Sequence, residues 1–211
     1  MAIDGPAGSG KSAVGRRLAS ALELPFVDSG LFYRALACAI EEGSAGGAEP
    51  DPAALALELE FDLGGDRIRA GGRDVTDLVY GAEISARAST LAQIPKVRSA
   101  LLGQQRSLAH DPGVVMAGRD IGTVVLPWAE HKFFLTAGVE ERARRRERQL
   151  RARGLAADED ALKAEISERD RQDTERAVAP LRPAADATVV ETEGVALEAV
   201  VARLLGLIRG A

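Results

Sequence analysis

This sequence of 211 residues contains one cysteine, Cys38, and has neither asparagine nor a long apolar run. One cysteine excludes an internal disulfide and is typical of a protein from a reducing compartment. No stretch reaches the roughly 18 apolar residues that a membrane-spanning helix needs, and the first residues do not have the pattern of a secretory signal. We therefore expect a cytoplasmic protein that does not associate with a membrane.

The chain also has no excess of positive charge. Its formal net charge is −5, so the sequence does not predict a large basic surface for nucleic acid, and we expect no such partner. Of the 27 basic residues only four are lysine, and the other 23 are arginine. Because a guanidinium group offers a fork of N–H donors to phosphate or carboxylate, the positions of the arginines are more informative than their number.

Short apolar segments alternate with amphipathic stretches along most of the chain. This pattern predicts an α/β fold with a parallel sheet covered by helices on both faces. The five strands are expected near residues 1–4, 24–28, 113–117, 132–136 and 187–191. Helices are expected at 11–22, 29–42, 139–153, 159–176 and 195–208.

Residues 58–109 interrupt the alternation. The segment 58–75 alternates apolar and polar residues around Gly64-Gly65 and Gly71-Gly72, which predicts a small antiparallel meander, and two helices are expected at 82–92 and 95–109. The stretch 44–52 is rich in Gly, Ala and Pro and is interpreted as a surface linker. We therefore predict one domain of 1–211, with a core of 1–57 and 110–211 and an inserted lobe at 58–109.

The strongest motif begins directly after the first predicted strand and matches G-x-x-x-x-G-K-[ST]. Its glycines let backbone N–H groups curl around phosphate oxygens, and the following helix directs its positive end at the same anion. Lys11 is expected to reach the β- and γ-phosphates of ATP, and the Ser12 hydroxyl to bind Mg²⁺. The predicted ATP-binding residues are Gly5, Pro6, Ala7, Gly8, Ser9, Gly10, Lys11, Ser12 and Ala13.

This loop indicates a nucleoside triphosphate but does not say what happens to it. Guanine-specific switch proteins usually read the base with an Asn-Lys-x-Asp segment, which a chain without asparagine cannot contain. A motor or transporter ATPase would usually end a strand in an acidic residue, whereas the strand expected at 113–117 ends in alanine. These exclusions favour a small kinase.

The arginines support a kinase, because phosphoryl transfer needs cations around the migrating group and the acceptor phosphate. The helix at 142–153 carries seven arginines, most of which we interpret as a solvated surface with pairs such as Glu141–Arg145. The next helix differs. Leu162, Ile166, Arg169, Asp173 and Arg176 follow at steps of four and three, so they share one face, which begins apolar and becomes charged. That change predicts a polar cleft at its end rather than a purely structural ion-pair network.

Four motifs, in order along nearly the whole chain, resemble those of the bacterial cytidylate kinase family, within the P-loop nucleoside monophosphate kinase superfamily. They are the loop Gly5–Ser12, Asp28-Ser29-Gly30-x-x-Tyr33-Arg34, Gly118-Arg119-Asp120-Ile121-Gly122-Thr123, and Arg169-Asp170-x-x-Asp173-x-x-Arg176-Ala177-Val178-Ala179-Pro180-Leu181. The resemblance implies transfer of the γ-phosphoryl of ATP to CMP or dCMP, with UMP a poorer acceptor. It also implies a monomer, and it agrees with an inserted monophosphate-binding lobe that contains three strands.

The resemblance further implies roles for individual residues. Lys11, Arg119 and Arg176 would be catalytic, and the arginine helix would belong to a mobile lid at about 139–157. CMP would lie between the core and the inserted lobe. The implied acceptor residues are Ser29, Tyr33, Arg34, Arg119 and Arg176 near the monophosphate, Ser89, Arg98 and Asp120 at the cytosine edge, and Arg169 and Asp173 at the sugar.

Two positions depart from the family pattern. Ala117 stands where many members have an acid, so Asp28 or Asp4 would have to serve the outer magnesium shell. Trp128 stands where a small polar or acidic residue is common, and a lone tryptophan there favours packing over function. The sequence leaves two alternatives: a kinase for another acceptor, such as AMP, UMP or shikimate, and a regulatory module without an acceptor.

Overall fold

The computed structural model describes residues 1–44, 51–62, 67–70, 72–110, 112–152, 154 and 156–210. Within this part of the chain, two compact units are formed. The first joins Met1–Leu24 to Val115–Ala211, and the second is Pro25–Val114. Some predicted features lie outside the described residues: most of the linker at 44–52, the turn glycines 64, 65 and 71, and residues 153 and 155 of the predicted lid.

The five-stranded sheet has the order β2-β6-β1-β7-β8. Its strands are β1 (Ala2–Asp4), β2 (Phe26–Asp28), β6 (Val115–Gly118), β7 (Lys132–Thr136) and β8 (Thr188–Glu191). β1 pairs in parallel with β6 and with β7, and β7 pairs in parallel with β8. All five strands match the segments expected from the sequence, and the predicted P-loop α/β fold class is confirmed.

Parallel pairing brings the carboxyl ends of these strands to one edge of the sheet. In the register, Asp4 at the end of β1 lies level with Gly118 of β6 and with Phe134 of β7. The segments that leave this edge are the glycine-rich loop after β1, the Arg119-Asp120 segment after β6 and the start of α6 after β7. Ligands of open α/β sheets bind at this edge, so these segments are candidates for the site.

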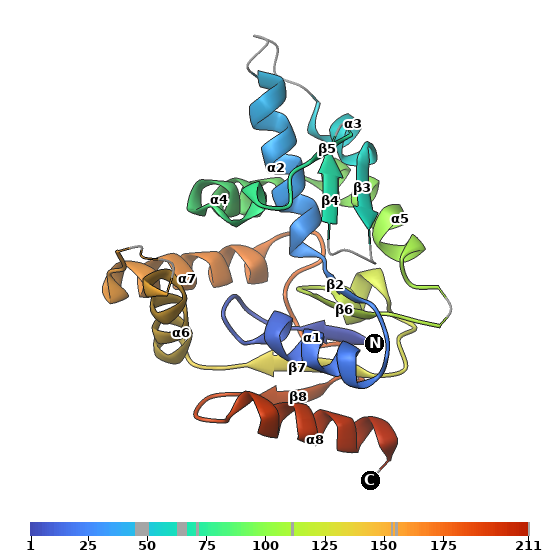
Figure 1. The fold of residues 1–211 in the computed structure, drawn as a ribbon, viewed down its shortest axis with the longest axis vertical. Coiled ribbons are helices and arrows are strands. Elements are labelled where there is room, and N and C mark those ends of the chain that lie inside the picture. The colour runs from blue at the N-terminus through green and yellow to red at the C-terminus, as the bar shows by residue number, and fades with distance from the viewer. Residues whose placement is uncertain are drawn as a thin grey trace. The chain divides into compact units, whose positions relative to one another are not determined.

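The core of the first unit is formed by the strands and two long helices. α1 (Lys11–Ala21) packs on β1 and β6 and contacts α8 (Leu197–Arg209), as Figure 1 shows below the centre of the molecule. Ile3, Met116 and Leu135 on the strands, and Leu18 and Leu204 on the helices, are all fully buried. Burial of each such side chain stabilises the fold by about 1.5–3 kcal/mol. The strands, and the starting points of the loops that leave them, are therefore held in place.

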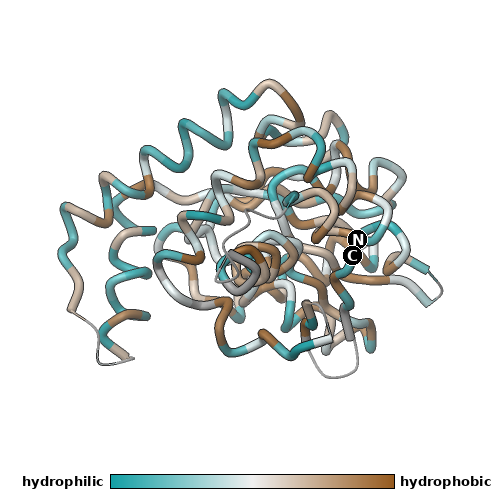
Figure 2. The backbone as a smooth tube through the Cα atoms, turned by 90° about the horizontal axis from the view of Figure 1, so that it is seen from above, coloured by the Kyte–Doolittle hydropathy of each residue, from teal (hydrophilic) through white to brown (hydrophobic). Residues whose placement is uncertain are grey.

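Two charged helices, α6 (Val139–Arg151) and α7 (Glu159–Glu175), pack against each other at the left of Figure 1. Figure 2 shows both mostly in teal, the colour of hydrophilic residues. A small apolar cluster of Ala143, Leu162 and Ile166 holds them together. Asp158 caps α7 by accepting hydrogen bonds from the N–H groups of Asp160 and Ala161. Little of this pair is apolar, so polar contacts must fix its place in the unit.

The second unit contains the predicted antiparallel meander of β3 (Leu59–Asp62), β4 (Arg67–Ala70) and β5 (Arg73–Asp74). Its long helix α2 (Gly30–Ser44) packs against β4 and against α4 (Ala82–Leu91). Through this packing the second unit includes residues 25–57 together with the region of the predicted lobe, whose boundaries at 58 and 109 stay a prediction. The unit also contains β2, α5 (Pro95–Ser107) and the 3-10 turn η1 (Leu78–Tyr80).

Two short elements besides η1 were not predicted. α3 (Pro52–Leu57) begins inside the stretch interpreted as a linker, and the Asp51 side chain caps it by accepting from the N–H of Ala53. η2 (Ile121–Val125) is a single π-helical turn directly after the Gly118-Arg119-Asp120 segment. Among the described residues, no helix combines the length and the apolar character needed to cross a membrane.

Candidate active site

The glycine-rich loop leaves β1 in a conformation that only glycine accepts at two positions. Gly5 has φ of 145°, and a Cβ there would lie 2.0 Å from the Leu135 carbonyl oxygen of the neighbouring strand. Gly8 has φ of 76°, and a Cβ there would lie 3.1 Å from the Cβ of Arg142 on α6. The glycines of the motif therefore let β7 and α6 approach the loop closely, and they also suit the geometry of phosphate binding.

The amino end of α1 is arranged as an anion site. Gly10, with φ of 95°, precedes the helix, no side chain caps it, and its first turn contains no acidic residue. Uncapped N–H groups at a helix start carry partial positive charge and attract phosphate. The buried Lys11 adds a full charge, and its Nζ lies 2.6 Å from the Pro6 carbonyl oxygen, to which it donates. Ser12, the predicted Mg²⁺ ligand, follows in the same turn.

Asp4 connects this loop to the segment after β6. It is 4% exposed, and its carboxylate accepts hydrogen bonds from the backbone N–H groups of Ile121, at 2.8 Å, and Gly122, at 2.7 Å. These bonds secure the first residues of η2, directly after Arg119 and Asp120. Burial raises the pKa of Asp4 from its ordinary value of 3.8 to about 6, against the opposing effect of the two N–H groups.

The raised pKa of Asp4 predicts a specific pH dependence of stability. Between pH 4 and 6 the folded state keeps a proton on Asp4 that the unfolded chain has released, so rising pH favours unfolding. Asp4 should therefore lower the free energy of unfolding by roughly 2 kcal/mol between pH 4 and pH 7. We expect Asp4→Asn to remove this decline. The measurement is the free energy of unfolding of the two proteins, obtained by chemical denaturation at several pH values between 4 and 7. The exposed Asp77→Asn should follow the wild type, and parallel curves for wild type and Asp4→Asn would contradict the assignment.

A cluster of alternating charges forms where the end of α7 meets the segment after β6. Arg119 Nε donates to Asp173 Oδ2 at 2.6 Å. Arg176 lies 3.6 Å from Asp120 and 3.7 Å from Asp173, and its side chain is only 4% exposed. The charged continuation of the α7 stripe thus forms a largely buried ion-pair network, and the polar cleft expected there stays a prediction. The network holds four of the predicted acceptor residues together.

The backbone after α7 keeps this network in place. Ala179 has φ of 54°, a left-handed conformation that is costly for a residue with a side chain. The turn allows the Ala179 carbonyl oxygen to accept from Arg176 Nε and the Leu181 N–H to donate to the Asp173 carbonyl oxygen. Burial by itself raises the pKa of Asp173, but the charges of Arg119, Arg169 and Arg176 outweigh it and lower that pKa. The carboxylate of Asp173 therefore remains ionised.

Five of the other predicted acceptor residues belong to the second unit, whereas Arg169 lies on α7 in the first. Arg34 forms an ion pair with Asp28 at 3.5 Å, and its Nε donates to the Gly30 carbonyl oxygen at 3.2 Å. The Arg98 guanidinium lies 5.8 Å from the centre of the Tyr33 ring, at the distance of a cation–π contact. The structure thus brings Arg34 to the end of β2 and Arg98 to Tyr33. Ser29 is buried and Ser89 is half-buried on α4.

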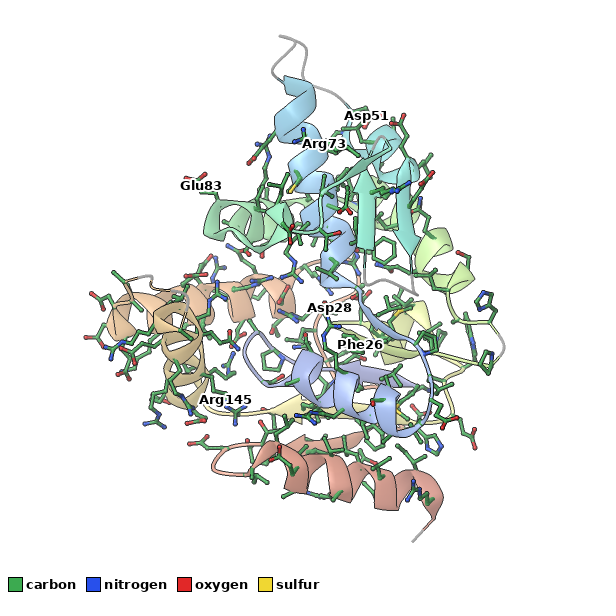
Figure 3. All side chains as sticks on the ribbon, viewed as in Figure 1. Phe26, Asp28, Asp51, Arg73, Glu83 and Arg145 are labelled. Carbon is green, nitrogen blue, oxygen red and sulfur yellow. The ribbon has the colours of Figure 1, made fainter. Side chains whose placement is uncertain are left out.

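Two arginines of α6 were not singled out from the sequence. Three of the six described arginines of this helix, Arg144, Arg148 and Arg151, are exposed, and Glu141 pairs with Arg144 at 3.3 Å and Arg145 at 2.9 Å. Arg145, labelled in Figure 3, also donates to both oxygens of Thr192, whose hydroxyl lies 3.1 Å from the Ser9 carbonyl oxygen. Arg142 is buried and reaches the Ala7 carbonyl oxygen at 3.1 Å. Arg142 therefore contacts the glycine-rich loop directly, and Arg145 contacts Thr192, which is hydrogen-bonded to that loop.

The two departures from the family pattern have structural counterparts. Ala117 is 1% exposed in β6, and the two aspartates considered as its substitutes already accept hydrogen bonds or an ion pair from the protein. Their role toward a metal stays a prediction. Trp128 is 61% exposed, so it does not join the core; it follows Pro127 in the turn between β6 and β7. Among the described residues there is no group of three or more His, Cys, Asp or Glu side chains that could hold a metal.

Comparison with known proteins identifies the family. The family model for cytidylate kinase matches residues 1–210. The chain belongs to the cytidylate kinase family. Cytidylate kinases from Exiguobacterium sibiricum and Pelotomaculum thermopropionicum are 46% and 47% identical to it, covering 100% and 95% of this chain and 97% and 92% of their own. The cytidylate kinase of Mycobacterium avium is 44% identical over 99% of this chain and 94% of its own.

Similarity to a solved structure supports the fold of this family member independently. This chain is similar to the crystal structure of an uncharacterized protein from Eubacterium ventriosum, with a TM-score of 0.54. The match covers 100% of this chain and 97% of that protein. At 12% identity the likeness concerns the fold alone.

Proposed function

We propose that this chain transfers the γ-phosphoryl group of ATP to CMP or dCMP, giving CDP or dCDP and ADP. The observation that carries the proposal is the match with cytidylate kinases over nearly the full length, at 44–47% identity. The geometry of the first unit is compatible with it, because an anion site at the start of α1 and a buried arginine–carboxylate network occur in the same unit. The enzyme is thus a phosphotransferase with a phosphate group as acceptor.

The donor half of the proposal concerns ATP and Mg²⁺. The loop Gly5–Ala13 would bind the triphosphate through its backbone N–H groups, and Lys11 would exchange its bond with Pro6 for the phosphate oxygens. The Ser12 hydroxyl fits Mg²⁺, which prefers oxygen ligands and usually keeps several waters beside phosphate oxygens. When bound, Mg²⁺ would neutralise charge on the phosphates. A site with one protein hydroxyl suits that mode of binding.

The acceptor half concerns the arginines. We propose that Arg34, Arg119 and Arg176 bind the monophosphate, that Ser29 and Tyr33 support it, and that Arg169 and Asp173 hold the sugar. Ser89, Arg98 and Asp120 would face cytosine, whose amino donor and adjacent acceptors can be read by a carboxylate and an arginine. Direct in-line transfer needs no protein nucleophile, because positioning and charge stabilisation supply most of the catalysis in this chemistry. We further propose that α6 and its connection to α7 close as a lid, and that the enzyme is a cytoplasmic monomer.

The test is a coupled assay of ADP formation with ATP, Mg²⁺ and one monophosphate at a time. We expect CMP and dCMP to support rapid turnover, UMP slower turnover and AMP almost none. The physical reason is that the cytosine amino group donates where uracil presents an acceptor, and an unmatched buried polar group costs roughly 1–3 kcal/mol, or about 10- to 100-fold in rate.

The alternatives give different results in the same assay. A kinase for another acceptor would respond to AMP, UMP or shikimate and not to CMP. A regulatory module without an acceptor would hydrolyse ATP slowly, at a rate that no monophosphate changes. Either result would contradict the proposed function.

A further inference from the structure

Arg142 differs from the other described arginines of α6 in its burial. Its side chain is 5% exposed, whereas those of Arg144, Arg148 and Arg151 are 51%, 70% and 68% exposed. A guanidinium group removed from water must replace the hydrogen bonds it loses, so a buried arginine is retained only where several acceptors converge on it. Its position in the first turn of α6 brings it to such a point.

Three acceptors from three different segments surround the Arg142 guanidinium group. Nε donates to the carbonyl oxygen of Ala137, directly after β7, at 2.9 Å. Nη1 donates to the carbonyl oxygen of Ala7, in the middle of the glycine-rich loop, at 3.1 Å. Nη2 donates to Asp170 Oδ2 on α7 at 2.6 Å, which is also an ion pair. One planar group therefore connects the sheet, the loop and α7.

Arg142 connects a segment proposed to bind the donor nucleotide with a segment proposed to bind the acceptor nucleotide. Ala7 lies in the loop proposed to bind ATP. Asp170 directly follows Arg169 and precedes Asp173 by less than one helical turn, so it lies on the helix that carries the proposed sugar contacts. The approach is close: a Cβ at position 8 would lie 3.1 Å from the Cβ of Arg142, and the φ of 76° there favours glycine.

We propose that Arg142 is a positioning residue that couples the glycine-rich loop to the acceptor-binding end of α7, so that donor and acceptor nucleotides strengthen each other's binding. The inference rests on the proposed function. A guanidinium group is rigid and planar, so a change in the direction of the Ala7 carbonyl changes the orientation available for Asp170. When a bound nucleotide orders the glycine-rich loop, the entropy cost of ordering the acceptor-binding end of α7 falls. The same holds in the opposite direction, because such coupling is reciprocal.

Isothermal titration calorimetry of CMP, with and without a non-hydrolysable ATP analogue and Mg²⁺, tests the coupling. In the wild type we expect CMP to bind roughly fivefold or more tightly when the analogue is present. In Arg142→Met that ratio should fall to about one, while CMP alone binds nearly as it does to the wild type. The control is Arg171→Met, which removes exposed ion pairs with Glu168 and Glu175 on α7 and should keep the wild-type ratio.

Two further variants keep the test decisive if Arg142→Met does not fold. Asp170→Asn preserves an acceptor oxygen but removes the charge, and Arg142→Lys preserves the charge but cannot reach three acceptors in one plane. Each should lower the ratio at least twofold. In the double variant Arg142→Met/Asp170→Asn, the ratio should equal that of Arg142→Met, because both changes break the same connection.

Several results would overturn the inference. A wild-type ratio of one, or an Arg142→Met protein with a lower melting temperature and an unchanged ratio, would show that Arg142 only stabilises the fold. These outcomes are distinct from failure of the proposed function, which would appear in the assay of the wild type as absence of CMP phosphorylation. A protein that phosphorylates CMP without coupling would contradict this inference alone.

Discussion

Lys11→Ala is expected to lower kcat by roughly 1,000-fold or more while the protein remains folded. Lys11 supplies a full positive charge at the start of α1, a helix whose first turn contains no acidic residue and whose start no side chain caps. Charge that develops on the phosphoryl group in the transition state is stabilised by such a cation, and single groups of this kind are worth about 10²- to 10⁵-fold in rate. The measurement is the coupled assay with saturating ATP and CMP, together with a thermal melt.

The matched control is Lys96→Ala, which removes an exposed lysine from α5 and should leave kcat unchanged. In the glycine-rich loop, Lys11 Nζ donates to the Pro6 carbonyl oxygen at 2.6 Å and lies 3.5 Å from the Ser9 hydroxyl oxygen. A Lys11→Ala protein with near-normal activity would disprove the proposed donor site. Loss of activity together with loss of the folded state would instead place Lys11 among the residues that stabilise the loop.

Arg119→Ala is expected to affect both activity and stability. Its guanidinium group donates to Asp173 at 2.6 Å in a largely buried network, so truncation should lower the free energy of unfolding by roughly 2 kcal/mol. If Arg119 also binds the acceptor phosphate, kcat/KM for CMP should fall by roughly 10²- to 10⁴-fold. The exposed Arg182→Ala should change neither quantity appreciably.

A double variant separates the two effects of Arg119. In Arg119→Ala/Asp173→Asn the buried carboxylate that has lost its closest cation is neutralised as well, so we expect part of the lost stability to return. Activity should not return, because the cation proposed to contact the phosphate is still missing. Recovery of activity together with stability would show that Arg119 acts only through the fold, and would remove it from the proposed catalytic residues.

The sequence predicted the framework of the fold because its signals are local. Apolar strands such as Ala2–Asp4 and Lys132–Thr136 are short runs bounded by glycine or polar residues, and each alternates with a helix of clear periodicity. All five predicted strands and the meander are present. Within α7, the spacing of Arg169, Asp173 and Arg176 was enough to predict that charged residues continue a buried stripe.

The elements that were missed depend on weaker or more distant signals. α3 has only six residues, and its Asp51 cap followed by Pro52 lies next to a Gly- and Pro-rich stretch that hid it. The π-helical turn η2 depends on Asp4, whose carboxylate secures Ile121 and Gly122 from 117 and 118 residues away. No pattern within Ile121–Val125 indicates that partner, so only the assembled sheet determines the turn.

The sequence by itself determined the glycine-rich loop, the parallel α/β order and the family, because each follows from residue types at fixed short spacings. The tertiary structure decided which of many similar charges are buried. Seven arginines in and after α6 look alike in the sequence, yet Arg142 reaches the glycine-rich loop and α7 while Arg148 remains exposed. The physical reason is that burial and hydrogen-bond partners depend on which strand ends meet at the edge of the sheet, and that depends on the packing of the whole unit.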